Sequence, residues 1–222
     1  VYEEQIFTMD ELREMLLKNF EGYEIQRQFL VNKMPKFGND SEEVDELVVE
    51  ITNRFFDQLE KYTNFNGGKI WAALYSVTAQ VGAGNKTGAT PDGRKSSLPL
   101  SDGLSPMYGC DRNGPTAALK SISKVDLMRA PNGVIVNQRI SPQVFKTSSG
   151  FEKMKLLLRS FVDLGGFHWQ FNCVSGDILR DAQIYPDEHR GLVVRVAGYS
   201  AFFIDLSKKA QDAIIERTEA IF

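Results

Sequence analysis

The stretch Leu192-Val-Val-Arg-Val-Ala-Gly-Tyr-Ser-Ala-Phe-Phe-Ile204 is a core-like apolar run that one glycine interrupts. Residues 192–197 have the composition of a short β-strand, and Gly198 follows them directly. Because glycine lacks a side chain, it permits a positive φ or the close approach of another backbone segment. Taken alone, the pattern predicts a tight turn or a bulge at Gly198 and indicates no chemistry.

The composition of the whole chain is that of an ordinary globular protein. Of its 222 residues, 42% are hydrophobic and 25% are charged, and the net charge is -3. Without a basic stripe, a nucleic-acid partner is not expected. No apolar stretch approaches the roughly 20 residues of a bilayer crossing, so no membrane span is expected either. The two cysteines, Cys110 and Cys173, are too far apart to signal a zinc site or a disulfide framework, which favours a reducing compartment.

Helical signals dominate the first part of the chain. Thr8-Met-Asp-Glu11 is a capping box, a second helical pattern follows from about Tyr23, and Ser41 opens a long amphipathic segment. The apolar run Ile70 to Val77, bounded by glycines, predicts a buried strand. The turn-rich stretch from Gly82 to Gly103 predicts a long ordered loop or linker. We therefore place a domain boundary within it, between residues 94 and 95.

The second part mixes strand and helix patterns. A strand is expected at Gly133 to Gln138. Phe167 to Cys173 alternates strictly, with Phe167, Trp169, Phe171 and Cys173 on one face and His168, Gln170 and Asn172 on the other. Helices are expected from Pro115, over residues 151–161, over residues 176–184, and after a cap at Ser207.

Spacing alone assigns little chemistry to these segments. Gly82-Ala-Gly84-Asn-Lys-Thr-Gly88 has the wrong spacing for a dinucleotide loop and no helical pattern after it, so we interpret it as a loop. His189 is expected to be solvated. His168 is expected to have a hydrogen-bonded structural role, with a catalytic role as the alternative. Both cysteines are expected to be structural, and no metal site is expected.

Arg195-Val-Ala-Gly198-Tyr-Ser-Ala201 resembles the signature of the glycyl radical enzymes, the superfamily that includes pyruvate formate-lyase. Other stretches resemble further blocks of that family in the same order, from about Lys36 onward. They are Gly88-Ala-Thr-Pro-Asp-Gly-Arg94, Pro99-Leu-Ser-Asp-Gly103, Gly114-Pro-Thr-Ala117, His168-Trp-Gln-Phe-Asn172 and Gln211-Asp-Ala-Ile-Ile-Glu-Arg-Thr218. This ordered set replaces the interpretation of Gly198 as a mere turn.

The resemblance implies that Gly198 stores a radical on its α-carbon. A radical-SAM activating enzyme, with S-adenosylmethionine and an iron-sulfur cluster, would remove one hydrogen there, and the chain itself would hold no cofactor. Without a Cβ the radical can be planar and delocalise into both neighbouring amides. We expect the loop to be supported by Arg195, Val196, Ala197, Tyr199 and Ser200. We expect it to be shielded from water and oxygen by Val193, Val194, Val196, Phe202 and Phe203.

The family passes the stored radical to a cysteine on a second loop, and the resulting thiyl attacks a small-molecule substrate. Neither Cys110 nor Cys173 matches the context of that cysteine. The chain is therefore expected to be the C-terminal part of a longer enzyme, an interpretation favoured by its start at Val1, which is not an initiator Met. The alternative is a separate, noncatalytic radical-carrying or repair subunit that docks onto a partner with the cysteine loop.

The implied fold class is α/β, namely the C-terminal portion of the glycyl radical enzyme α/β barrel, with the radical glycine on a buried loop. Residues 1–94 would belong to the pyruvate formate-lyase-like barrel domain, and residues 95–222 would form the glycine radical domain. The implied protein is cytoplasmic, works in anaerobic metabolism and is a homodimer. It would bind neither nucleic acid nor a membrane.

The residues around Gly198 are closer to the glycerol and diol dehydratase-like branch than to pyruvate formate-lyase itself, because Ala197 precedes the glycine and Ser-Ala-Phe-Phe follows Tyr199. A lyase that breaks a C–O, C–N or C–C bond is therefore expected. The alternatives are a pyruvate formate-lyase-like acyltransferase and an arylalkylsuccinate synthase. By resemblance Tyr75 lines the substrate pocket, and Trp71, on the same strand face, is a second pocket candidate. His168 and Gln170 are second-tier site candidates.

Overall fold

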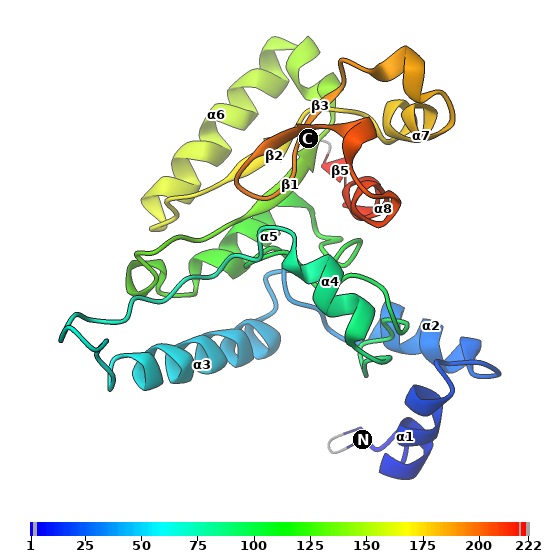
Figure 1. The fold of residues 1–222 in the computed structure, drawn as a ribbon, viewed down its shortest axis with the longest axis vertical. Helices are drawn as coiled ribbons and strands as arrows, with labels where there is room; N and C mark the ends of the chain where they lie inside the picture. Colours follow the sequence, from blue (N-terminus) through cyan, green and yellow to red (C-terminus); the bar gives the residue numbers. More distant parts are fainter. Residues whose placement is uncertain (2–3, 218, 221–222) are drawn as a thin grey trace. The chain divides into compact units, whose positions relative to one another are not determined.

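The computed structural model describes residues 1, 4–217 and 219–220, which form two compact units (Figure 1). The first unit combines residues 1–35 with residues 79–100, and the second combines residues 36–78 with residues 101–222. Over the described residues, no helix has both the length and the apolar composition that a bilayer crossing requires. The domain boundary at residues 94/95 stays a prediction.

The first unit contains the helices α1 (Met9–Leu17), α2 (Glu24–Lys33) and α4 (Ala79–Lys86). The capping box is confirmed, because Thr8 accepts the N–H of Glu11 and the Glu11 carboxylate accepts the N–H of Thr8. Burial of a small apolar cluster then stabilises the unit; its core is Leu12, Met15, Phe20 and Leu30.

The helix α4 corrects the prediction of an unbroken loop from Gly82 to Gly103. Gly84 is buried in this helix, and a Cβ there would lie 2.2 Å from the carbonyl oxygen of Leu98. The glycine therefore serves the close packing of residues 98–100 on the helix, a long-range requirement that local spacing does not show. The buried Arg94 orders the following loop by donating to the carbonyl oxygens of Gly88 and, at 2.7 Å, Leu98.

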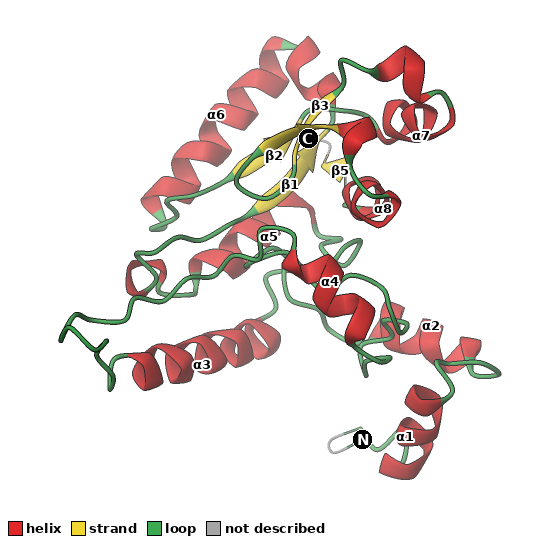
Figure 2. Cartoon of the chain, viewed as in Figure 1, coloured by secondary structure: helices red, strands yellow, loops and turns green. Residues whose placement is uncertain are grey.

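The second unit mixes helices with two small sheets (Figure 2). Its parallel sheet has the order β2-β1-β5, with Asn137 opposite Gln170 and Arg139 opposite both Asn172 and Glu219. Its second sheet is the antiparallel hairpin β3-β4. The strands are β1 (Asn137–Ile140), β2 (Gln170–Asn172), β3 (Val193–Arg195), β4 (Ser200–Phe202) and β5 (Glu219–Ala220).

Helices pack on both sheets of this unit, and the expected positions of most of them are confirmed. The α-helices are α3 (Glu42–Leu59), α5 (Gly114–Ser123), α6 (Ser148–Asp163), α7 (Gly176–Ile184) and α8 (Lys208–Glu216). Short 3₁₀ helices are η1 (Leu127–Arg129), η2 (Pro142–Lys146), η3 (Pro186–His189) and η4 (Phe203–Asp205). Ser207 caps α8 as expected, since its hydroxyl accepts the N–H of Ala210.

The predicted strand from Ile70 to Val77 is wrong in part. The segment is extended, but its ladder is a single parallel bridge between Leu74 and Val134, with hydrogen bonds of 2.9 Å and 3.1 Å to Gly133 and Ile135. Its alternate side chains Trp71 and Tyr75 are 58% and 43% exposed. The outward face of the run is therefore partly open to solvent in the described part of the chain.

The core of the second unit lies where the sheets meet the helices. One cluster joins Ile140 and Val144 to Met154 of α6, with Trp169 and Phe171 packed against it. Another cluster lies under the β3-β4 hairpin and consists of Ile135, Leu179, Ala182, Val194, Val196, Ala197, Phe203 and Ile214. The alternation over Phe167 to Cys173 is thus confirmed in its middle, while both end residues are exposed.

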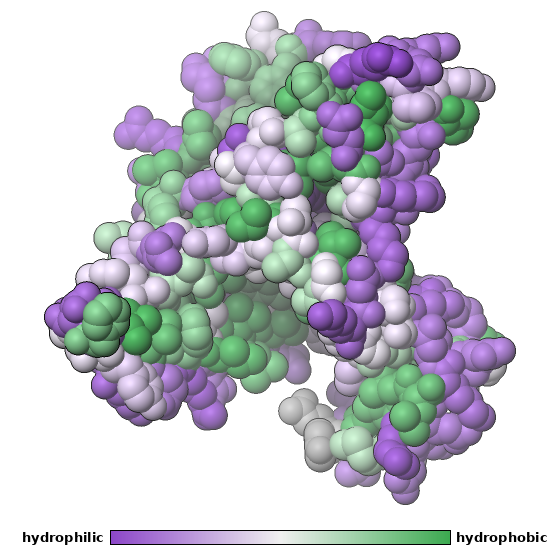
Figure 3. Space-filling model, viewed as in Figure 1, coloured by the Kyte–Doolittle hydropathy of each residue, from purple (hydrophilic) through white to green (hydrophobic). Residues whose placement is uncertain are grey.

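Apolar side chains also reach the surface. Leu47, Ile51 and Phe55 of α3 are between 43% and 65% exposed, and Figure 3 shows apolar surface at the place of this helix. Leu156 and Val162 of α6 are exposed as well. Such contiguous apolar area is typical of a surface that another part of an assembly covers.

Candidate functional site

Gly198 occupies the tip of the β3-β4 hairpin. Arg195 pairs with Ser200, and the N–H of Val196 donates to the carbonyl of Tyr199 at 2.9 Å, which leaves Ala197 and Gly198 as the connecting residues. The φ of Gly198 is 85°, in the left-handed region that glycine adopts without steric cost. Among the described residues, a Cβ here would meet the Cδ1 atom of Ile135 alone, at 3.4 Å, which is an ordinary contact distance. The backbone conformation, rather than lack of space, is what favours glycine here.

The hairpin is buried on one face and exposed on the other. Val194, Val196, Ala197 and Phe203 are at most 2% exposed, so this part of the expected apolar shield is present. Val193 and Phe202 are about half exposed, and Gly198, Tyr199 and Ser200 are exposed too. The prediction of a buried loop is therefore not met within this chain, because the cluster under the hairpin covers only one of its faces.

The side-chain amide of Asn172 bonds both backbone groups of Arg195 at the root of the hairpin, as the backbone of a neighbouring strand would. Its side-chain oxygen accepts the N–H of Arg195 at 2.6 Å, and its side-chain N–H donates to the Arg195 carbonyl at 2.8 Å. Asn172 belongs to β2 and is buried, so these two bonds connect the hairpin to the parallel sheet. Unpaired, either amide group would incur the cost of burying a polar atom.

The side chain of Arg195 continues this connection. Its guanidinium donates to the Ser200 hydroxyl at 3.2 Å and to the side-chain oxygen of Gln170 at 3.1 Å. Gln170 in turn donates to the side-chain oxygen of Asn137, and Asn137 donates to the carboxylate of Asp102. A chain of polar side chains thus runs from the hairpin through β2 and β1 to a carboxylate that is fully buried.

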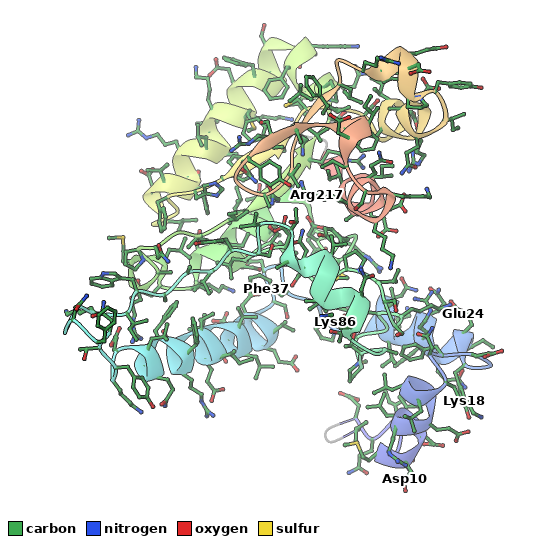
Figure 4. All side chains as sticks on the ribbon, viewed as in Figure 1. Asp10, Lys18, Glu24, Phe37, Lys86 and Arg217 are labelled. Carbon is green, nitrogen blue, oxygen red and sulfur yellow. The ribbon has the colours of Figure 1, made fainter. Side chains whose placement is uncertain are left out.

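Arg217 closes this arrangement from the end of α8 (Figure 4). Its guanidinium donates to the carbonyls of Val196 at 2.8 Å and Arg195 at 3.2 Å, and forms an ion pair of 3.0 Å with Asp102. Burial lowers the pKa of Arg217, and the charge of Asp102 opposes that shift. Asp102 also accepts the Ser76 hydroxyl at 2.6 Å.

Asp102, Asn137, Asn172 and Arg217 are site residues that the sequence did not single out. Asp102 and Arg217 lie within the family-like blocks 99–103 and 211–218, and Asn172 shares the polar strand face with Gln170. The alternation predicted that this face needs partners. It could not show that those partners are Arg195, 25 positions after Gln170, and Asn137 on the neighbouring strand.

His168 has a structural contact, in line with the favoured expectation. Its Nδ1 atom accepts the N–H of Val136 at 3.3 Å, which places the proton of a neutral ring on Nε2. Burial, and then the positive charge of Arg195, lower the pKa of His168. His189 corrects the expectation of a solvated side chain, because it is 22% exposed and its Nε2 lies 2.6 Å from a carboxylate oxygen of Asp181.

Neither cysteine belongs to the β3-β4 hairpin that carries Gly198. Cys110 is half-buried, and Cys173 is exposed just after β2 instead of lying inside an apolar face. Partial burial raises the pKa of the Cys173 thiol, which disfavours the reactive thiolate. Among the described residues, no group of His, Cys, Asp and Glu side chains has the arrangement of a metal site.

Trp71 and Tyr75 lie on the segment beside residues 133–135. The Nζ atom of Lys69 is 5.6 Å from the centre of the Trp71 ring, and the Tyr75 ring lies against Gly133. Two residues after Gly133, Ile135 faces Gly198. The structure therefore places Trp71 and Tyr75 on a segment next to the one that contacts Gly198. Neither side chain is among the described atoms within 4 Å of a Cβ built on Gly198.

Comparisons with known proteins agree with this geometry. A family model described as "Glycine radical" matches residues 100–204, and one described as "Pyruvate formate lyase-like" matches residues 1–84. The chain is 45% identical to a B12-independent glycerol dehydratase from Clostridium butyricum, solved with glycerol bound, with a TM-score of 0.94 over 100% of this chain and 28% of that one.

Two further relatives extend this agreement. A hydroxyproline dehydratase from Clostridioides difficile, solved with trans-4-hydroxy-L-proline bound, is 39% identical with a TM-score of 0.96, over 100% of this chain and 28% of that one. The isethionate sulfite-lyase of Bilophila wadsworthia is 40% identical over 98% of this chain and 26% of the relative. The chain thus spans somewhat more than a quarter of the length of the relatives it matches.

The chain belongs to the glycyl radical enzyme superfamily, and the glycine radical match includes the hairpin that carries Gly198. Within the superfamily, its relatives are dehydratases and lyases, which confirms the dehydratase-like branch expected from the residues around Gly198. The structural neighbours also confirm the fold class expected from the resemblance.

Proposed function

We propose that this chain supplies the radical-storing part of an anaerobic lyase of the dehydratase type, and that Gly198 is the residue that stores the radical. The observation that carries the proposal is the form of the hairpin. Its tip exposes the α-carbon of Gly198, while its root is fixed by buried hydrogen bonds. A residue that must first be reached by an activating enzyme and then be held still for chemistry needs both properties.

The proposed reaction begins with loss of one hydrogen atom from the α-carbon of Gly198. A partner enzyme with S-adenosylmethionine and an iron-sulfur cluster supplies that step. The glycyl radical then takes a hydrogen atom from a cysteine thiol, so that a C–H bond forms and an S–H bond breaks. The resulting thiyl abstracts hydrogen from a small organic substrate. We assign the thiol to a loop outside this chain and to neither Cys110 nor Cys173.

Shielding of the radical is proposed to be completed by a surface outside this chain. Val193 and Phe202 are 50% and 48% exposed on either side of the hairpin, and Tyr199 is 39% exposed at its tip. These side chains form an exposed apolar rim along the hairpin that carries Gly198. Covering this rim would exclude water and oxygen from the radical and would also bury apolar area.

The wider setting is proposed from the same chemistry. A stored carbon radical requires an oxygen-poor, reducing compartment, so we propose a cytoplasmic, homodimeric enzyme of anaerobic metabolism. We propose a domain boundary between residues 94 and 95. Tyr75 and Trp71 are proposed to line the substrate pocket, since their segment adjoins the one that contacts Gly198.

The test is cleavage by oxygen at the stored radical. The native polypeptide is activated anaerobically, its electron paramagnetic resonance spectrum is recorded, and it is then exposed to air and weighed by mass spectrometry. We expect a glycyl radical signal and cleavage at Gly198. The Gly198→Ala variant should show neither. An activated wild-type protein without signal and without cleavage, or a variant that is still active, would contradict the proposal.

A further inference from the structure

Five residues close a ring of hydrogen bonds at the root of the hairpin, four of them by their side chains and Arg195 by both its side chain and its carbonyl. Starting at Asp102, the ring passes through Asn137 and Gln170 to the guanidinium of Arg195. It returns from the carbonyl of Arg195 through Arg217 to Asp102. We name this set the root ring. Asp102, Asn137, Gln170 and Arg217 are each at most 7% exposed, so water competes little for these bonds.

The order of donors and acceptors in the root ring is forced. The carboxylate of Asp102 only accepts, and the guanidinium of Arg195 only donates. Asn137 must therefore turn its amide N–H to Asp102, and Gln170 must turn its carbonyl to Arg195. Flipping either amide would bring two donors together at one end and two acceptors at the other. The ring consequently stabilises a single arrangement of its members.

The root ring acts on the backbone immediately before Gly198. The two Arg217 contacts are to the carbonyls of Arg195 and Val196, and Gly198 follows Val196 by two residues. The guanidinium fork fixes both carbonyls at once, which a point charge cannot do. A shift of these carbonyls would therefore move the α-carbon of Gly198.

We propose that the root ring is a positioning device that sets the place of the Gly198 α-carbon for hydrogen-atom exchange with the thiol, and that Arg217 is its principal positioning residue. The proposal rests on the proposed function. Transfer of a hydrogen atom from sulfur to carbon requires the two atoms to be close and aligned, and a misplacement of about 1 Å can lower a rate by roughly 100-fold. Storage of the radical depends on Gly198 itself and tolerates such a shift.

The experiment separates storage from transfer in the native enzyme. In Arg217→Lys the positive charge remains and can reach Asp102, but the fork that holds both carbonyls is lost. We expect the radical per chain to stay within about twofold of wild type and turnover per radical to fall about 10- to 100-fold, with KM unchanged. Arg190→Lys is the matched control, because the Arg190 side chain is 75% exposed and its ion pair is with Asp187 of η3, the short helix that ends just before it. It should leave all three quantities unchanged.

Gln170→Met provides a second route to the same conclusion. Methionine has a similar length but makes neither the bond to Asn137 nor that to Arg195. The Gln170 side chain has no hydrogen bond in the ring to the hairpin backbone. A fall in turnover per radical in this variant would therefore mean that Gln170 affects Gly198 through the other members of the ring. The double variant that combines Arg217→Lys with Gln170→Met should have about the same turnover per radical as the slower single variant. Both changes open the same ring, so their effects should not add.

Three outcomes would overturn the root ring as a positioning device. They are unchanged turnover per radical in both single variants, fully additive losses in the double variant, and a loss of radical in proportion to activity. In each of these outcomes the wild-type protein still forms its glycyl radical, so the proposed function survives. An activated wild type without any glycyl radical overturns both proposals, and the spectrum distinguishes this outcome from the other three.

Discussion

Gly84 lies in the helix α4 and Gly198 in the turn of the β3-β4 hairpin, and the surroundings of their α-carbons are opposite. Gly84 is buried in α4, and a Cβ there would lie 2.2 Å from the carbonyl oxygen of Leu98 and 2.7 Å from the α-carbon of Pro99. Gly198 is exposed, has a φ of 85°, and has one neighbour at ordinary contact distance. Gly84 is therefore required by packing. At Gly198, glycine is required by the backbone conformation and, in the proposed function, by the chemistry of its α-carbon.

The largest effect on stability is expected from Gly84→Ala. The added methyl group would meet backbone atoms that no side-chain rotation can move, so we expect the unfolding free energy of the first unit to fall by about 3 kcal/mol or more. Denaturant unfolding, with hydrogen exchange of the α4 amides as a local readout, measures this change. A loss below about 1 kcal/mol would mean that residues 98–100 yield easily and that the comparison of the two glycines is wrong.

A smaller effect on stability is expected from Gly198→Ala. The methyl group has space, so the cost is that of a left-handed conformation for alanine, about 1–2 kcal/mol. The fold should persist while the radical is lost. Gly191→Ala is the matched control in the same loop region, because it has neither a positive φ nor an atom within 4 Å of the added group, and it should not abolish the radical. A loss at Gly198 as large as that at Gly84 would contradict a purely conformational role.

Gly82→Ala sharpens the comparison within α4 itself. Gly82 is exposed, and no described atom lies within 4 Å of an added Cβ, although it lies only two residues before Gly84. Alanine favours the helix over glycine, so we expect the unfolding free energy to rise by about 0.5–1 kcal/mol. Opposite signs for Gly82→Ala and Gly84→Ala in the same unfolding assay would establish that packing against residues 98–100, and not helix propensity, sets the requirement at Gly84.

The smallest effect on stability is expected from protonation of His168. Because the folded protein lowers the pKa of His168, the unfolded state binds more protons in the acid range. Stability is therefore complete above the ordinary histidine pKa of about 6.5 and decreases as the pH falls from there through the lowered folded value. Unfolding between pH 7.5 and pH 5 should show a weaker pH dependence in His168→Asn than in wild type. Equal slopes would contradict the assignment.

The sequence could propose site residues where they are contiguous, but not where distant residues meet. Gly198 and its neighbours from Arg195 to Ser200 could be proposed because they are contiguous and resemble a signature. Asp102 and Arg217 could not be assigned, since their pairing joins positions 115 residues apart. The exposure of Gly198 was also missed, because an apolar sequence does not say how many of its faces a chain covers.

The sequence by itself determined the local elements. The caps at Thr8 and Ser207 and the helix over residues 176–184 follow from hydrogen bonds and periodicity within a few residues. Tertiary structure decided that Gly82 to Lys86 is helical, that Ile70 to Val77 forms only one bridge, and that a ring of polar groups surrounds the hairpin root. Each of these depends on whether distant segments supply a close backbone, a ladder partner or a buried counter-charge, and neighbouring residues in the chain carry no such information.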